Sequence, residues 1–260
     1  ARVRFVMEDA LRPPALDPRA ALFLDFDGTL VPIAPRPDGI EVGAWLVPTL
    51  QQLHALLGGA LALVSGRPLS ELDAWLAPLR LPAAGVHGVE RRDGDGPTRR
   101  LAGGLPDALI HRVERLVART PDLRLERKPG ALALHYRDAP HLGDMCARMM
   151  LAAARPHAEL TVLLGKCVVE VKPRGATKAN AVSEFLARPA FAGRQPVFVG
   201  DDATDEDGFA AVQAVGGIGI KVGDGPSGAQ FRLGGPEAVR LWLQAALPQP
   251  AYPVALEAAR

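Results

Sequence analysis

The sequence predicts an α/β fold in which a parallel sheet flanked by helices is interrupted by a smaller α+β unit. Two observations support this fold class. Apolar strand-like runs alternate with helical patterns over residues 20–90 and again after Pro173, and such alternation is typical of parallel sheets. Between these stretches the order changes to helix, hairpin, helix, hairpin, which indicates a unit inserted into the first.

Length and composition are those of an ordinary globular protein. The 260 residues are 48% hydrophobic and 23% charged, with a formal net charge of +1, so nothing favours nucleic acid or a membrane surface as a partner. The two cysteines, Cys146 and Cys167, are too few for a disulfide framework. No apolar run approaches the ~18 residues of a membrane-spanning helix, and residues 1–14 lack the apolar core of a signal peptide. We therefore expect a cytoplasmic protein.

The first part of the chain contains three predicted strands, at residues 20–25, 60–64 and 83–86, and two predicted helices, at residues 44–57 and 69–79. The first helix is indicated by leucines at spacings of three and four residues, and Gly58-Gly59 ends it. Residues 1–19 should form coil or a loose helix, and the prolines within 32–40 predict an irregular loop.

The middle of the chain follows a different pattern. Residues 93–104 are rich in turn formers, and the paired arginines around them, Arg91-Arg92 and Arg99-Arg100, suggest a solvated hairpin. The predicted elements that follow are helices at 105–119 and 141–155 and strands at 123–128, 131–137, 160–164 and 167–171. We therefore expect a core of residues 1–103 and 173–260, with 104–172 as the inserted unit.

The last part returns to the first pattern. Helices are expected at residues 177–186, 207–215 and 237–247, and strands at 196–199 and 218–222. The tail, residues 248–260, contains three prolines and should be only loosely attached.

Four predicted strands end in residues that are able to take part in catalysis or ligand binding. Asp25 and Asp27 follow the first strand, Ser65 the second, His87 the third, and Asp201-Asp202 a strand of the last part. A lone Asp-x-Asp is more often a polar turn than a site. Ligands of open parallel sheets bind beyond the carboxyl ends of the strands, however, so these side chains should converge.

The converging groups are suited to phosphoryl transfer. Four carboxylates offer the hard oxygen ligands that Mg²⁺ prefers: Asp25, Asp27, Asp201 and Asp205. Lys178, at the start of a helix, can supply a fixed positive charge, while Ser65 and Gly66 offer a hydroxyl and backbone N–H groups.

Four segments, in this order, resemble the motifs of the haloacid dehalogenase (HAD) superfamily. They are Asp25-Phe26-Asp27-Gly28-Thr29-Leu30, Val64-Ser65-Gly66-Arg67, Lys178, and Gly200-Asp201-Asp202-Ala203-Thr204-Asp205-Glu206. Each motif alone is weak, but four in order within the expected strand–helix context are specific. The resemblance implies a Rossmann-like core with an inserted α+β cap and Mg²⁺-dependent chemistry.

The resemblance also implies roles for individual residues. Asp25 would be the nucleophile that forms an aspartyl-phosphate. Asp27 would be the acid/base that protonates the leaving oxygen and then activates water. Ser65 and Lys178 would hold the phosphate oxygens during catalysis.

The expected magnesium ligands are the carboxylates of Asp25 and Asp201 and the backbone carbonyl of Asp27. Asp205 would be a further ligand or a close neighbour of the metal. An aspartate at the position of Asp27 favours a phosphatase or phosphomutase over the transport ATPases and dehalogenases of the superfamily.

The inserted unit resembles the cap of the trehalose-6-phosphate phosphatase family. That family has Glu-x-Lys in the first cap hairpin, here Glu126-Arg127-Lys128, and Gly-Lys…Glu in the second, here Gly165-Lys166 and Glu170. The resemblance covers about residues 22 to 222. The substrate-binding residues that it implies, together with the phosphate site, are Ser65, Gly66, Arg67, Glu126, Lys128, Glu170 and Lys178.

The pattern of the first hairpin is compatible with this assignment. A two-residue turn at Pro129-Gly130 would place Arg124, Glu126, Lys128 and His135 on one face of the hairpin. Taken without the resemblance, a polar face of an antiparallel sheet is more often simply solvated.

The resemblance implies an enzyme that hydrolyses trehalose 6-phosphate to trehalose and phosphate, the final step of trehalose biosynthesis. We expect a monomer with a functional link to a trehalose-6-phosphate synthase and no nucleic-acid or membrane partner. The alternatives are a phosphatase for sucrose phosphate or mannosyl-phosphoglycerate, a phosphomutase, and a catalytically silent domain that binds sugar phosphate and regulates a synthase.

Overall fold

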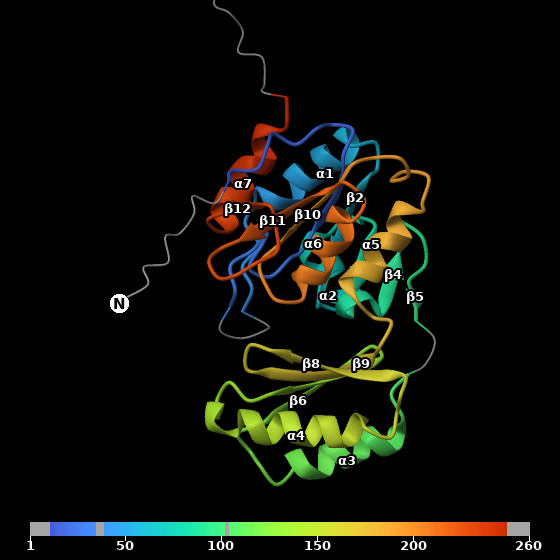
Figure 1. The fold of residues 1–260 in the computed structure, drawn as a ribbon, viewed down its shortest axis with the longest axis vertical. Coiled ribbons are helices and arrows are strands. Elements are labelled where there is room, and N and C mark those ends of the chain that lie inside the picture. The colour runs from blue at the N-terminus through green and yellow to red at the C-terminus, as the bar shows by residue number, and fades with distance from the viewer. Residues whose placement is uncertain (1–10, 35–38, 102–103, 249–260) are drawn as a thin grey trace, which may run out of the picture.

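An eight-stranded sheet and a four-stranded sheet organise the protein (Figure 1). The computed structural model describes residues 11–34, 39–101 and 104–248. The expectations for residues 1–10, 35–38 and 249–260 lie outside these described residues. Within them, no helix is long and apolar enough to cross a membrane.

The large sheet has the strand order β12-β11-β10-β1-β2-β3-β4-β5. Its strands are β1 (Ala21–Leu24), β2 (Leu61–Val64), β3 (Ala83–Gly85), β4 (Glu90–Arg92), β5 (Arg99–Arg100), β10 (Pro196–Gly200), β11 (Ile218–Val222) and β12 (Phe231–Leu233). The pairs from β12 to β3 are parallel, and β4 and β5 add an antiparallel edge. Leu24 of β1 pairs with Val199 of β10 and Leu63 of β2, so these three strands end at one edge.

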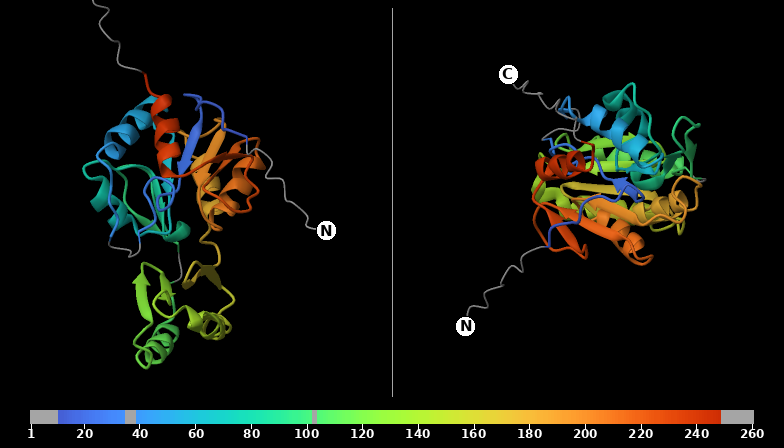
Figure 2. Two further views of the ribbon diagram at one scale, coloured as in Figure 1. Left: turned by 90° about the vertical axis from the view of Figure 1, so that its left-hand side faces the viewer. Right: turned by 90° about the horizontal axis from the view of Figure 1, so that it is seen from above.

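Helices cover both faces of the large sheet. They are α1 (Leu46–Leu56), α2 (Leu69–Leu76), α5 (Lys178–Leu186), α6 (Asp205–Gln213) and α7 (Pro236–Ala245), with a short 3-10 helix η1 (Val86–Gly88) after β3. Helices α5 and α6 lie side by side on one face, and α1 and α7 lie on the other (Figures 1 and 2). A sheet covered on both faces needs near-continuous apolar strands, which is why β1 is apolar throughout.

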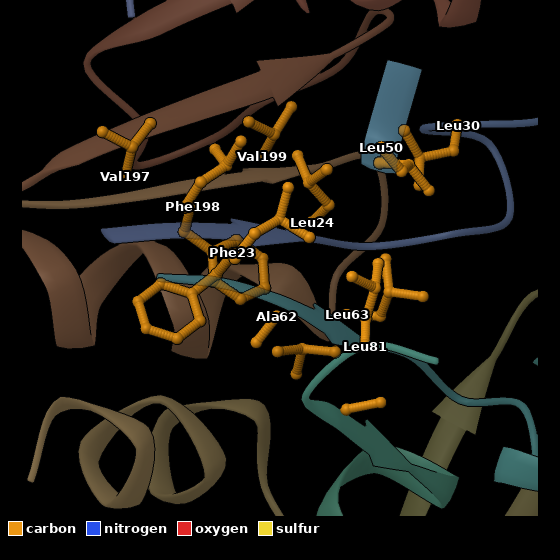
Figure 3. Packing of buried hydrophobic residues seen from close by; sticks show 14 of the residues in the cluster. Phe23, Leu24, Leu30, Leu50, Ala62, Leu63, Leu81, Val197, Phe198 and Val199 are labelled. Atoms are coloured by element: carbon orange, nitrogen blue, oxygen red, sulfur yellow. The ribbon is translucent and has the colours of Figure 1, made fainter. Parts of the chain in front are cut away.

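Strand β1 is fixed in the centre of the core (Figure 3). The Phe23 ring packs against those of Phe185 and Phe191, with centroid separations of 6.2 and 5.5 Å. Phe198 of the neighbouring β10 meets Phe209 of α6 edge to face at 5.7 Å. This packing gives the end of β1, and the aspartates that follow it, a rigid base.

The second unit runs from α3 to β9 and has its own sheet and core. Its elements are α3 (Asp107–Val117), β6 (Arg124–Lys128), β7 (Ala131–His135), a 3-10 turn η2 (Pro140–Leu142), α4 (Gly143–Ala154), β8 (Leu160–Gly165) and β9 (Val168–Pro173). The sheet is antiparallel in the order β6-β7-β9-β8. Both helices cover the sheet face that points away from the large sheet (Figure 1), and a separate apolar cluster fills the space between.

Three features differ from the sequence expectations. The strand β12 was not predicted. Strands β4 and β5 form the expected antiparallel hairpin, with Arg91 paired to Arg99. The expectation of a solvated hairpin is wrong for Arg92, which is buried and donates to Asp73 at 2.6 and 2.8 Å and to the Leu81 carbonyl at 3.1 Å. These three bonds to its terminal nitrogens offset the cost of burying the guanidinium, although its Nε is buried without a partner among the described residues. Helix α6 begins two residues earlier than predicted, at Asp205.

Candidate active site

Asp25 lies directly beyond β1 and is buried. Its Oδ1 accepts a hydrogen bond from Lys178 Nζ at 2.8 Å, and its Oδ2 accepts one from Thr29 Oγ1 at 3.3 Å. The chain then turns at Gly28, whose φ is +77°. A Cβ at Gly28 would lie 2.2 Å from an Asp201 carboxylate oxygen, so only glycine lets these two segments approach so closely.

Lys178 joins the Asp25 segment to the last part of the chain. It is the first residue of α5, whose N-cap Thr177 accepts the Asn180 N–H through its side chain. Lys178 Nζ also donates to Asp205 Oδ1 at 2.6 Å. Burial opposes the charge, but the carboxylates of Asp205 and Asp25 outweigh it and raise the pKa of Lys178 well above its usual value.

Three carboxylates form a cluster that fits a divalent cation. One oxygen each from Asp25, Asp201 and Asp205 lies within 4.8 Å of the others. Burial, together with repulsion from neighbouring carboxylates, raises the pKa of Asp25 and that of Asp201 to about 7. A cation bound between these carboxylates would therefore stabilise their ionised forms. Hard oxygen donors in this arrangement suit Mg²⁺.

Asp205 also holds the loop after β10. Its Oδ2 accepts the backbone N–H groups of Asp201 and Asp202 at 2.9 and 3.0 Å, while its Oδ1 accepts Lys178. Among the described residues, Asp205 thus accepts three hydrogen bonds from the protein, whereas Asp25 accepts two, one of them the long 3.3 Å bond from Thr29. This geometry favours the role of a neighbour that orients Asp201 over that of a direct metal ligand.

The carboxylate of Asp27 points elsewhere. It accepts two hydrogen bonds from Arg67, at 2.8 and 2.9 Å, and is not part of the three-carboxylate cluster. The two aspartates of the motif therefore have different surroundings, one beside a buried lysine and the other beside an arginine at the pocket wall.

The turn after β2 is braced by the segment after β3. Ser65 is buried, and its Oγ accepts the Arg67 N–H at 3.1 Å. A Cβ at Gly66 would lie 2.7 Å from the His87 imidazole. His87 has a left-handed backbone conformation (φ 54°), and burial, reinforced by nearby lysines, lowers its pKa well below the usual value. The ring is therefore neutral.

A cavity of about 640 Å³ lies between the large sheet and the second unit. Its lining includes, from the large-sheet side, Asp27, Gly66, Arg67, His87 and Asp201, and from the second unit, Glu126, Lys128, His135 and Glu170. The structure thus brings residues from both parts of the sequence to one pocket. Asp25 and Lys178 are buried behind this lining, and an Asp25 oxygen lies within 4.8 Å of one of Asp201, which lines the pocket.

The predicted sugar-contacting residues form two polar groups on the second sheet. Lys128 Nζ donates to Glu170 Oε2 at 2.9 Å and to the Gly66 carbonyl at 3.3 Å, which bridges the two units. Glu126 Oε2 lies 2.7 Å from His135 Nε2. Burial by itself would raise the pKa of Glu126, but the hydrogen bond to His135 and nearby positive charges lower it below its usual value. The Glu126 carboxylate is therefore an ionised acceptor.

Sequence reasoning missed a buried cation beside the site. Lys221 of β11 donates to the carbonyls of Asp201 and Val222, each at 2.6 Å. Through the Asp201 carbonyl, Lys221 holds the loop that follows β10 against β11. A lone lysine in an otherwise apolar buried strand was the available signal.

A family model for trehalose-phosphatase matches residues 23–234. The chain belongs to the trehalose-phosphatase family. It is 43% identical over 241 residues to the trehalose-6-phosphate phosphatase of Escherichia coli (strain K12), covering 91% of this chain and 90% of that protein. The α/β fold with its parallel sheet is shared with solved trehalose-phosphatases and HAD-like hydrolases, as predicted.

Two further trehalose-phosphatase relatives extend the comparison. The C-terminal domain of trehalose-6-phosphate phosphatase from C. albicans shares the fold with a TM-score of 0.76 at 24% identity, covering 92% of this chain and 99% of that one. A bifunctional trehalose-6-phosphate synthase/phosphatase from Thermoproteus tenax is 35% identical over 236 residues, which are 87% of this chain and 32% of that protein.

Proposed function

We propose that this protein is a Mg²⁺-dependent phosphatase that hydrolyses trehalose 6-phosphate to trehalose and phosphate. The observation that carries the proposal is the pocket itself. One wall lies over the buried Asp25–Lys178 pair, and the other presents Glu126, Lys128 and Glu170. The activity named for the E. coli relative supports this reading.

Asp25 is the proposed nucleophile. Its carboxylate attacks the phosphorus, the bond to the sugar oxygen breaks, and an aspartyl-phosphate forms. Lys178 fixes the attacking carboxylate through its hydrogen bond to Oδ1 and opposes the charge of the phosphate. Ser65 and the backbone beside Gly66 hold the phosphate oxygens.

Asp27 is the proposed acid/base. It gives a proton to the departing sugar oxygen and then takes a proton from the water that cleaves the aspartyl-phosphate, so it ends the cycle as it began. Its place at the pocket wall suits contact with the leaving group.

Asp25, Asp201 and the Asp27 carbonyl would hold Mg²⁺, with Asp205 supporting Asp201. When bound, Mg²⁺ supplies positive charge that offsets the repulsion between the carboxylate and the phosphate. The raised pKa values of Asp25 and Asp201 are consistent with this need.

Residues 104–172 form the proposed cap, and 1–103 with 173–260 the phosphatase core. Glu126, Lys128 and Glu170 would bind sugar hydroxyls. Glu170 Oε1 is buried without a hydrogen-bond partner among the described residues and lies 3.9 Å from His87 Nε2. A hydroxyl would satisfy this oxygen, and a site built for hydroxyls rejects analogues that lack them.

The test is a phosphate-release assay, with and without Mg²⁺, on trehalose 6-phosphate, sucrose phosphate, mannosyl-phosphoglycerate and glucose 6-phosphate. Trehalose 6-phosphate should be preferred and Mg²⁺ required. Asp25→Asn should fold, as judged by circular dichroism, and lack turnover. Preference for another phosphosugar would replace the substrate assignment, and no release from any of them would favour a silent binding domain.

The setting of the enzyme is also a proposal. We propose a cytoplasmic monomer that acts after a trehalose-6-phosphate synthase. The T. tenax relative, which is named for both activities, supports this link.

A further inference from the structure

We infer that Arg67 is a positioning residue that fixes the Asp27 carboxylate for proton transfer to the leaving oxygen. The inference rests on the proposed function, which gives that proton transfer to Asp27. Arg67 Nε donates to Asp27 Oδ2 at 2.8 Å, and Nη2 donates to Oδ1 at 2.9 Å. A fork of two parallel hydrogen bonds sets both the position and the plane of a carboxylate.

Asp27 needs such an anchor because of where it lies. It has left β1, it precedes Gly28 with its positive φ, and its side chain is 31% exposed at the pocket wall. Within the described part of the chain, the hydrogen bonds to its carboxylate all come from Arg67. A group that transfers a proton must lie within hydrogen-bond reach of its target, so an unanchored Asp27 would be a poor acid.

Arg67 is itself anchored on helix α2. Its Nη1 donates to Glu71 at 3.1 Å, and its guanidinium lies 5.0 Å from the centroid of the Trp75 ring. Trp75 in turn stacks on Phe26 with an interplanar angle of 2° and a centroid separation of 5.5 Å. Phe26 lies between the two aspartates of the motif, so one stack of side chains ties α2 to the Asp25–Asp27 segment.

Three roles for Arg67 can be separated by the leaving group. A direct contact with the phosphate predicts equal losses on every phosphate monoester when Arg67 is removed. A direct contact with the sugar predicts a loss on trehalose 6-phosphate alone. A positioning role predicts losses that grow as the leaving group becomes more basic, because only basic leaving groups need a proton as they depart.

The test compares kcat/KM of the wild type and Arg67→Met on trehalose 6-phosphate, phenyl phosphate and p-nitrophenyl phosphate. This ratio reports only the steps up to departure of the leaving group. The variant should lose about 100-fold on trehalose 6-phosphate, about 10-fold on phenyl phosphate and less than about 3-fold on p-nitrophenyl phosphate. Arg67→Lys should show the same ranking, because lysine keeps the charge but not the fork.

Two further variants sharpen the result. Arg80→Met is the matched control, since Arg80 is exposed after α2 and, among the residues that the structure describes, forms an ion pair with Asp73 alone, at 4.0 Å. Its three kcat/KM values should equal those of the wild type. In an Asp27→Asn background, Arg67→Met should add almost nothing, because the group that it positions no longer carries the proton.

Equal losses on all three substrates, or a loss on trehalose 6-phosphate with none on phenyl phosphate, would overturn the inference. If the wild type does not release phosphate from trehalose 6-phosphate, the proposed function fails, while the comparison of the two aryl phosphates still decides the role of Arg67. Should Arg67→Met fail to fold, Glu71→Gln loosens the same anchor and should give the same ranking with smaller losses.

Discussion

Replacing Lys178 by methionine should destabilise the metal-free protein by about 3–5 kcal/mol. The ammonium is buried and donates to Asp25 at 2.8 Å and to Asp205 at 2.6 Å. Methionine fills a similar space but leaves both carboxylates buried without a cation, and an unpaired buried charge is what makes the loss of one partner so costly. The expected loss is a large share of the ~5–15 kcal/mol that folded domains have in total.

The size of the loss should increase with pH. In the wild type the pKa of Lys178 is raised well above its usual value, so the ammonium persists in both states near neutrality. In the variant the carboxylates lose their compensating charge, and their folded-state pKa values rise further above the ordinary 3.8. A carboxyl with a raised folded-state pKa binds its proton more tightly in the folded protein, so the free energy of unfolding falls as the pH rises through that pKa. The deficit should therefore be small near pH 5 and large near pH 8.

Urea unfolding followed by circular dichroism, in EDTA at both pH values, measures this. Lys166→Met is the control, because Lys166 is exposed in the turn between β8 and β9, and it should change the unfolding free energy by less than about 0.5 kcal/mol. A Lys178→Met deficit below about 1 kcal/mol at the higher pH, or one that shrinks as the pH rises, would refute the reasoning.

Three further predictions follow from the site. Glu126→Ala should lower kcat/KM for trehalose 6-phosphate by about 10- to 100-fold, the worth of a hydrogen bond to a charged group, and barely affect p-nitrophenyl phosphate; equal losses would remove the sugar contact. Gly28→Ala should lower the free energy of unfolding by at least about 1–3 kcal/mol, because the φ of Gly28 is +77° and the new Cβ would meet Asp201. Thermal melting measures this, and an unchanged melting temperature would contradict it. Mg²⁺ should raise the melting temperature more at pH 8 than at pH 5, because the pKa values of about 7 for Asp25 and Asp201 let protons compete with the metal; equal shifts would argue against the metal site.

The central strands of the large sheet could be predicted from the sequence, while the edge strand β12 could not. Strands β1, β2 and β10 are buried apolar runs that are followed by polar motifs. The apolar residues indicate the strand, and the polar residues indicate where it ends. Strand β12 is a half-buried segment of three residues, Phe231–Leu233. It is a strand because it pairs with β11, and no local pattern records such a pairing.

The site shows the same limit. The spacing of the motifs predicted which side chains meet beyond the strand ends, because strand ends of a parallel sheet converge. It did not indicate the partners. Arg67 reaches Asp27 across 40 positions, and Lys128 reaches the Gly66 carbonyl across 62. These contacts depend on how two elements pack, and side-chain direction after packing is not encoded in either segment alone.

The two separate hydrophobic cores have a consequence for how such a chain can evolve. The cluster around β1 holds Asp25 and Lys178, and a different cluster, which includes Leu134 and Val169, supports the sheet that bears Glu126 and Glu170. A small third cluster joins the two units, in which Val86 and Val89 pack with Ala131 of β7. Away from it, substitutions in the two cores share no packing partners and should add independently. The strands of the second sheet that line the pocket can therefore accumulate changes within the tolerance of their own core. Substitutions in the second sheet can therefore change which phosphosugar is preferred while the Asp25–Lys178 site stays the same.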